Sequence, residues 1–146
     1  MTSAAPVLLV EDSQEDFEIT VGALRLANMR NPIVRCANGR EVAQLLNHQG
    51  PYQCIRRPSL ILLDLNLAGS DGRSLIRQFR KNDWLHSIPL TVLSTSSSPV
   101  DIELCYQAGA NSYLIKPLDL DRFEVMILNL ITYWFDTAVL PYGGII

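Results

Sequence analysis

Short apolar runs alternate along this chain with longer segments in which apolar residues recur at helical spacing. The runs fall near residues 6–10, 33–37, 60–65, 90–94 and 112–116, and few polar residues interrupt them. Runs of this kind are typical of parallel strands that are covered by helices on both faces. The alternation predicts an α/β fold with an open, doubly wound sheet of five strands.

The segments between the runs predict five helices. Ser98 suits an N-cap, Pro99 the first helical position and Gly109 the end of the fourth helix, and the third follows the turn 70–72. Residues 47–59 predict an irregular surface loop, longer than most connections. We expect a single domain, 1–146, with a core at about 6–135 and a tail at 136–146. The predicted helices span about 14–28, 39–48, 72–82, 99–109 and 119–135.

Composition excludes several classes of protein. The formal net charge of −3 argues against a direct nucleic-acid partner, which would require basic patches. No apolar stretch is long enough to span a membrane and the first residues do not resemble a signal peptide, so we expect a cytoplasmic protein. Cys36, Cys54 and Cys105 show no metal-binding spacing; we expect reduced thiols, with Cys36 and Cys105 in the core.

Polar side chains follow four of the apolar runs. Glu11 and Asp12 follow the first, Asp64 the third, Ser94 the fourth and Lys116 the fifth. Because the carboxyl ends of parallel strands lie at one edge of a sheet, these groups should meet. Three adjacent carboxylates repel one another unless a divalent cation keeps them ionised. Oxygen ligands without Cys or His indicate Mg²⁺ or Mn²⁺.

Such a set has the parts of a phosphoryl-transfer site with an aspartate nucleophile. Asp64 would attack the phosphorus atom, while Lys116 and the metal would neutralise phosphoryl oxygens and Ser94 would bind a third. Glu11, Asp12 and Asp64 are the candidate metal ligands, together with the backbone carbonyl of Asn66 in the following loop. The product would be an acyl phosphate on Asp64.

Five motifs together resemble the receiver domain of two-component response regulators, over roughly residues 6–135. They are Val10–Ser13, Leu62–Leu67, Asp71–Arg73, Leu93–Thr95 and Ala108–Pro117. Two departures from the family pattern are mild. Glu11 stands where the family more often has Asp, and Ser94 where it often has Thr, so neither a charge nor a hydroxyl is lost.

The resemblance implies strand order 2-1-3-4-5, Mg²⁺, and phosphorylation of Asp64 by a sensor histidine kinase. It also makes Ser94 the switch hydroxyl and Tyr113 the switch aromatic, which turns inward once phosphorylated Asp64 has drawn in Ser94. A cis bond before Pro117 would aim Lys116 at the site. The protein would then be a signalling protein that catalyses its own phosphorylation and dephosphorylation, rather than an enzyme acting on a separate substrate.

The loop 47–59 and the segment 133–141 further resemble the phytochrome-associated response regulators of cyanobacteria, which implies a phytochrome-type kinase and a homodimer. Helix 119–135 carries more apolar surface than one sheet face can cover. We expect a dimer through helix 99–109, strand 112–116 and helix 119–135, although the tail 137–146 could cover this surface instead. The expected interface residues are Phe123, Ile127, Ile131, Trp134 and Phe135.

Other functions require different residues. A haloacid-dehalogenase-like phosphatase needs a second Asp at position 66, which is Asn, and a flavodoxin-like carrier needs hydroxyls and amides where Glu11 and Asp12 stand. A receiver fold that acts as a dimerisation or adaptor module without phosphorylation remains an alternative. No output domain is expected in the thirty residues after Lys116, so the signal should be read through an altered interface with a downstream target that the sequence does not identify.

Overall fold

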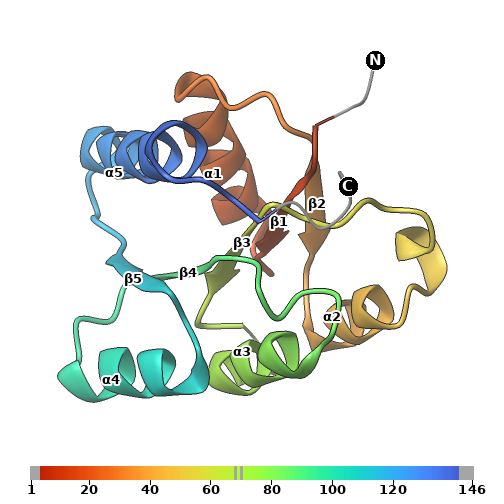
Figure 1. The fold of residues 1–146 in the computed structure, drawn as a ribbon. Coiled ribbons are helices and arrows are strands. Elements are labelled where there is room, and N and C mark those ends of the chain that lie inside the picture. Colours follow the sequence, from red (N-terminus) through yellow and green to blue (C-terminus); the bar gives the residue numbers. More distant parts are fainter. Residues whose placement is uncertain (1–3, 68, 70, 142–146) are drawn as a thin grey trace.

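A five-stranded parallel sheet forms the centre of the molecule (Figure 1). The structure is a computed structural model that describes residues 4–67, 69 and 71–141. Within these residues the strand order is β2-β1-β3-β4-β5, which confirms the predicted fold class and order. The strands are β1 (Val7–Val10), β2 (Ile33–Cys36), β3 (Leu60–Asp64), β4 (Leu90–Ser94) and β5 (Ser112–Ile115).

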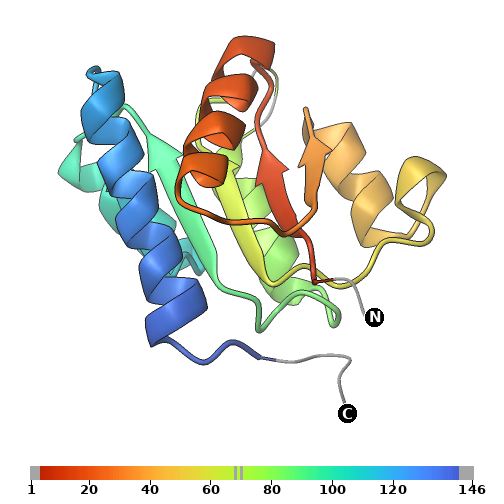
Figure 2. The same ribbon diagram turned by 90° about the horizontal axis from the view of Figure 1, so that it is seen from above.

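The strands run in the same direction, so their carboxyl ends lie at one edge (Figure 2). In register, Val10 of β1 pairs with Leu63 of β3, and Asp64 pairs with Leu93 of β4. Ser94 in turn pairs with Ile115 of β5. The three central strands therefore end side by side, each followed by the polar residues of the candidate site.

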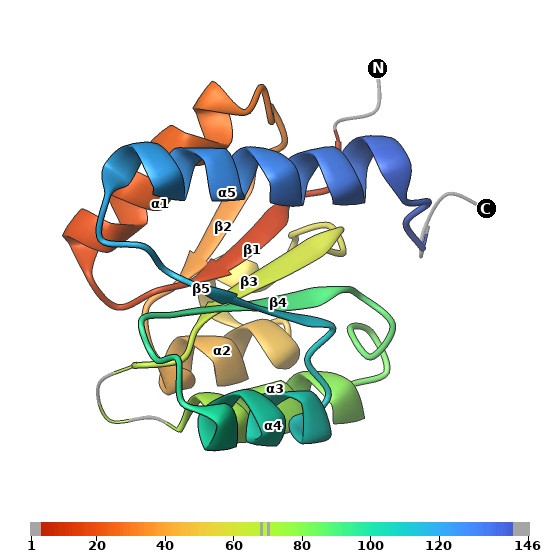
Figure 3. The same cartoon turned by 90° about the vertical axis from the view of Figure 1, so that its left-hand side faces the viewer.

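Two hydrophobic cores cover the two faces of the sheet. Successive strand residues point to opposite faces, so Leu8 and Ile61 enter one core while Leu9 and Leu62 enter the other. Helices α2, α3 and α4 cover the first face, and α1 and α5 cover the second (Figure 3). The helices are α1 (Gln14–Leu26), α2 (Gly39–Leu46), α3 (Gly72–Lys81), α4 (Pro99–Ala108) and α5 (Leu120–Thr132).

Side-chain caps place the helix starts close to their predicted positions. Ser98 caps α4 by accepting the Asp101 N–H, and Ser13 caps α1 by accepting the Asp16 N–H. Gly109 ends α4 with φ at 121°, a conformation that favours glycine. Asp71 caps α3 as the predicted turn requires, while Ser70 of that turn lies outside the described residues.

Several boundaries differ from the predicted ones. Helices α1 and α2 end two residues early, because Asn28 and His48 adopt positive φ and stop the helical path. The loop 47–59 is not wholly irregular, since Gly50–Tyr52 forms a 3-10 turn and the buried Tyr52 donates its hydroxyl to the backbone oxygen of Arg35 at 2.9 Å. A π-helix, Tyr133–Thr137, follows α5.

The predicted dimer interface on α5 differs from what the structure shows. Phe123, Ile127 and Ile131 are buried in the second core, beneath α5, and are therefore already covered within the monomer. Trp134 and Phe135 are partly buried against the same core. Sequence spacing marked one apolar side of the helix correctly, but that side faces the sheet and α1. The large apolar residues that remain exposed on and beside α5 are Leu118, Leu120, Val125, Leu128 and Tyr133.

Cys36 and Cys105 are buried free thiols, as predicted, and Cys54 is exposed. Burial raises the pKa of the Cys36 thiol to about 12, so this side chain stays protonated.

No helix within the described ranges is long and apolar enough to cross a membrane. The tail beyond residue 141, which one alternative placed over α5, lies outside these ranges.

Candidate phosphoacceptor site

Asp64, Glu11 and Lys116 meet at the carboxyl edge of the sheet. The ammonium of Lys116 donates to Asp64 Oδ2 at 2.9 Å and to Glu11 Oε1 at 3.4 Å. Glu11 and Asp64 are buried, and only 14% of the Lys116 side chain is exposed. Residues separated by about fifty positions in sequence are thus in direct contact, as the parallel topology predicts.

Burial and charge shift the pKa values of the two carboxylates in opposite directions, so that Glu11 binds a proton more readily and Asp64 less readily. Burial, followed by the hydrogen bond and negative charge of Asp64, raises the pKa of Glu11 to about 7. Burial also acts to raise the pKa of Asp64, but hydrogen bonds from Glu11, Lys116 and the Asn66 amide outweigh it and leave this pKa below its usual value. Burial acts to lower the pKa of Lys116, yet its contacts with Asp64 and Glu11 hold that pKa above the usual value. Asp64 is therefore the ionised member, as a nucleophile must be.

Backbone hydrogen bonds in the segments after the strands orient the side chains of Asp64, Glu11 and Lys116. The Asn66 N–H donates to Asp64 Oδ1 at 2.8 Å, which leaves one Asp64 oxygen bound to the loop and the other to Lys116. The Ser13 N–H donates to Glu11 Oε2 at 3.3 Å. Lys116 is held beside β4 because its own N–H donates to the Ser94 backbone oxygen at 2.7 Å.

The bond between Lys116 and Pro117 is trans, which corrects the expected cis bond. Every peptide bond in the described residues is trans. The trans form is favoured by about 0.5–1 kcal/mol before proline. Lys116 reaches both carboxylates without a cis bond, because the backbone contact with Ser94 already directs it toward the site.

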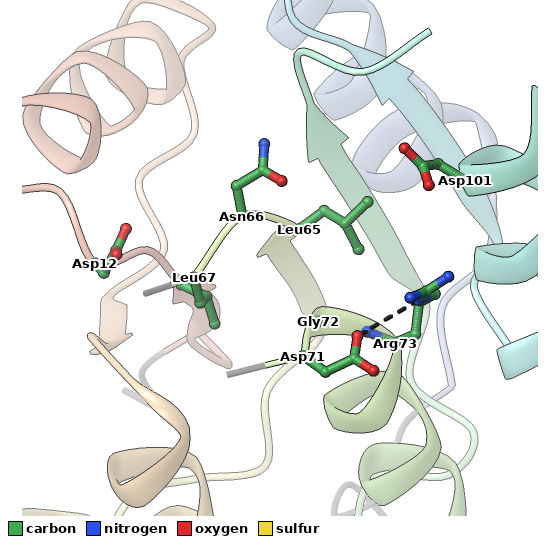
Figure 4. Close-up of a pocket in the computed structure, with 8 residues that line it drawn as sticks. All are labelled: Asp12, Leu65, Asn66, Leu67, Asp71, Gly72, Arg73 and Asp101. Atoms are coloured by element: carbon green, nitrogen blue, oxygen red, sulfur yellow. Dashed lines mark hydrogen bonds and ion pairs between the residues drawn. The ribbon is translucent and has the colours of Figure 1, made fainter. Parts of the chain in front are cut away.

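The predicted metal ligands occupy two adjoining places. One carboxylate oxygen from each of Glu11, Asp16 and Asp64 lies within 4.8 Å of the others. Asp12 and Asn66 line a neighbouring hollow of about 450 Å³, with Asp71, Arg73 and Asp101 on its other side (Figure 4). Asp16 was absent from the predicted set because its position in the first turn of α1 suggests only a favourable helix-dipole contact.

The donor set fits a hard divalent cation. One carboxylate oxygen from each of Glu11, Asp16 and Asp64 lies within 4.8 Å of the others, and burial together with the negative charge of Asp64 raises the pKa of Glu11 in spite of the nearby Lys116. A dication would supply the missing positive charge through oxygen ligands, which Mg²⁺ and Mn²⁺ prefer.

Ser94 and Tyr113 are joined by the loop between β4 and α4. The Ser96 N–H donates to Ser94 Oγ at 3.1 Å, and the Tyr113 hydroxyl donates to the Ser96 backbone oxygen at 2.9 Å. The Tyr113 ring is half-buried against the core. In this structure the ring already contacts the loop, whereas the expected sequence of events brought it inward only after phosphorylation. A buried tyrosine hydroxyl needs an acceptor, and the Ser96 oxygen provides one.

Arg35 of β2 supports the acidic loop, which the sequence did not predict. Its guanidinium donates to the backbone oxygen of Glu11 at 3.1 Å and to that of Asp12 at 3.4 Å, and lies 4.5 Å from the centre of the Phe17 ring. The only sequence signal was a basic residue within an otherwise apolar strand. Its target is unforeseeable, because backbone oxygens carry no sequence signature.

The raised pKa of Glu11 predicts an unusual pH dependence of stability. The folded-state pKa of about 7 exceeds the ordinary 4.5, so the stabilising effect of the bound proton is full below about pH 4.5 and is lost as pH rises toward 7. Without divalent metal, the melting temperature should therefore fall between pH 5 and 7.5. Calorimetry of the wild type and Glu11→Gln measures this, since the variant should lose that contribution. Added Mg²⁺ should reverse the fall at pH 7.5; an identical pH profile in the two proteins would contradict the assignment.

Comparison with known proteins identifies the architecture. Residues 7–128 match the response regulator receiver domain. The chain belongs to the response regulator receiver family. The response regulator Rcp1 of Synechocystis sp. is 34% identical to this receiver over 135 residues, which cover 92% of each chain.

Solved structures agree with the receiver assignment across nearly the whole chain. The phosphorylated cyanobacterial phytochrome response regulator RcpA has a TM-score of 0.88 at 33% identity, and the match covers 96% of this chain and all of RcpA. The Mn²⁺-bound form of Rcp1 has a TM-score of 0.86 at 33% identity and covers 95% of this chain and all of the other. The haloacid-dehalogenase and flavodoxin alternatives are thereby set aside.

Proposed function

We propose that this receiver accepts a phosphoryl group on Asp64 from a sensor histidine kinase of the phytochrome type. The observation that carries the proposal is the contact of one lysine ammonium with two buried carboxylates, at 2.9 Å for Asp64 and 3.4 Å for Glu11. This arrangement keeps Asp64 ionised and puts a fixed positive charge beside it. A receiver fold that acted only as an adaptor, without phosphorylation, would have no use for this cluster of buried charges, whose desolvation costs free energy.

The chemistry follows from the placement of each group. A carboxylate oxygen of Asp64 attacks the phosphorus atom, the bond from phosphorus to the kinase histidine nitrogen breaks, and the imidazole leaves with that electron pair. Lys116 lies where it can neutralise a phosphoryl oxygen, and the Ser94 hydroxyl is available to another. The chain thereby catalyses its own phosphorylation, and attack of water on the acyl phosphate would release inorganic phosphate and restore the Asp64 carboxylate.

Mg²⁺ is the proposed cofactor, held by Glu11, Asp12 and Asp64 with the Asn66 carbonyl, and with Asp16 as an additional neighbour. When bound it supplies positive charge to the phosphoryl oxygens and to the carboxylates. Glu11 then stays ionised at neutral pH without cost to the fold. The Mn²⁺-bound structure of Rcp1 supports a divalent cation in a related receiver.

Phosphotransfer from a kinase tests the proposed partner. Two relatives with about one-third identity are a cyanobacterial phytochrome response regulator and Rcp1, which supports a light-sensing donor. A radiolabelled, autophosphorylated phytochrome-type kinase should pass its label to the wild type within minutes in Mg²⁺. An autophosphorylated kinase with an unrelated sensor should do so more slowly at equal concentration. Equal rates from both kinases would remove the phytochrome assignment and leave the receiver function intact.

We infer that the phosphorylated state is read through the surface of α4, β5 and α5, where a second copy would bind. Exposed apolar residues support this inference, since Ile115, Leu118 and Leu120 lie together in sequence across the end of β5 and the start of α5. Light scattering of Leu118→Asp and wild type measures the interface. The variant should be monomeric at concentrations where wild type dimerises, and an unchanged mass would exclude this surface.

A further inference from the structure

Ser96 lies in the loop between β4 and α4, and its hydrogen bonds connect this loop to the neighbouring elements. Its N–H donates to Ser94 Oγ, and its backbone oxygen accepts the Tyr113 hydroxyl. Its own hydroxyl accepts the Ser98 N–H at 3.2 Å and donates to Asp101 Oδ2 at 2.6 Å. Each polar group of this one residue is thus engaged, by β4, by β5 and by the start of α4.

The contact with Asp101 fixes the direction in which the Ser96 hydroxyl donates. A carboxylate is only an acceptor, so the Ser96 hydroxyl must be the donor in this pair. The O···O distance of 2.6 Å is in the range of charge-assisted hydrogen bonds, which are about twice as strong as neutral ones. Asp101 lies in the first turn of α4, a regular helix that packs on the sheet, so it offers a fixed anchor.

The orientation of Ser96 determines what the Ser94 hydroxyl can do. Because the Ser96 N–H occupies one lone pair of Ser94 Oγ, that hydroxyl has its own proton left to donate. Ser94 is fully buried at the end of β4, next to the strand that ends in Asp64. The hydroxyl is held ready as a donor at the edge where the phosphoryl group would arrive. The position of the Ser94 hydroxyl therefore depends on the loop between β4 and α4, which the hydrogen bond from Ser96 to Asp101 holds in place.

We propose that Asp101 is a positioning residue for phosphoryl transfer, which acts through Ser96 to hold the Ser94 hydroxyl in place. The inference rests on the proposed function of the site and adds a residue that lies on another element. Asp101 also lines the hollow that Asp12 and Asn66 line, on the same side as Arg73 (Figure 4). A hydroxyl held by a rigid anchor stabilises the transition states of phosphoryl transfer to Asp64 and of hydrolysis of the acyl phosphate alike. Asp101 therefore alters both rates by a similar factor and leaves their ratio unchanged.

The test compares rates of labelling by acetyl phosphate in Mg²⁺ and rates of label loss after the donor is removed. Asp101→Ala and Ser96→Ala should each slow both rates by about tenfold to a hundredfold, the effect of one hydrogen bond to a charged group. The double variant should be no slower than either single one, since both break the same link. Asp101→Asn keeps an acceptor oxygen and should recover part of the rate.

Glu103→Ala is the matched control, because it removes from the same helix an exposed carboxylate that accepts a hydrogen bond from Gln107. It should label at the wild-type rate. Effects of Asp101 and Ser96 that add in full, equal rates for Asp101→Asn and Asp101→Ala, or an equal slowing by Glu103→Ala would each overturn the proposal. A fall in melting temperature without a change in either rate would show a purely structural role and overturn it too. Failure of wild type to label would instead count against the proposed function itself.

Discussion

Replacement of Asp64 by asparagine is expected to reduce labelling by acetyl phosphate to background while the fold persists. An amide has no anionic oxygen to attack phosphorus, and the remaining carboxylates lack the contact of 2.9 Å with Lys116 that Asp64 makes. The variant should stay folded but be less stable than wild type near pH 7, because the lowered pKa of Asp64 means that its ionised form, in contact with Lys116, stabilises the fold. Gel retardation of the phosphoprotein and thermal unfolding measure the two effects.

Asp121→Asn provides the control for this substitution. Asp121 lies in the first turn of α5, is exposed, and its N–H donates to Asp119 Oδ1 at 3.0 Å. Its variant should label like wild type. Labelling that survives in Asp64→Asn at a comparable rate would place the phosphoacceptor elsewhere.

Replacement of Lys116 by methionine should damage both stability and phosphorylation. It leaves Glu11 and Asp64 buried without their shared cation, and breaking a buried ion pair costs about 3–5 kcal/mol of unfolding free energy. Because Glu11 can take up a proton, we expect the lower part of this range. Labelling should slow by about 100-fold, as for loss of one charge-stabilising group. Urea unfolding and labelling rates measure these changes.

Magnesium separates the two roles of Lys116. The carboxylates remain in Lys116→Met, so Mg²⁺ should restore much of the lost stability by supplying positive charge at the same place. It should not restore the labelling rate, because the ammonium beside the phosphoryl oxygen is still missing. Lys81→Met, an exposed position at the end of α3, should change neither quantity. A Lys116→Met protein as stable as wild type without metal would contradict the buried-pair account.

The strand-end chemistry was predictable because it depends on topology. Parallel strands place their carboxyl ends together, so Glu11, Asp64 and Lys116 could be grouped from sequence alone. Capping followed in the same way, since Ser98 and Pro99 mark a helix start by local rules. Burial of Cys36 and Cys105 followed from the apolar pattern around them.

Contacts to backbone atoms were not predictable in this way. Arg35 binds two carbonyl oxygens and Tyr52 binds a third, and any residue type supplies such acceptors. The bond from Ser96 to Asp101 crosses a loop whose path the sequence does not define. For α5, helical spacing identified an apolar side but not its direction, so Phe123 was placed at an interface when it belongs to the core.

The central claim is that a buried acidic cluster, compensated by Lys116 and a divalent cation, prepares Asp64 for phosphorylation. Intact-mass measurement of wild type after incubation with acetyl phosphate tests it most directly, with Mg²⁺ in one sample and a chelator in the other. Borohydride reduction then marks the modified residue for peptide mapping. We expect one phosphoryl group, on Asp64, in Mg²⁺ and none with chelator. Equal labelling in both samples, or a modified residue other than Asp64, would contradict it.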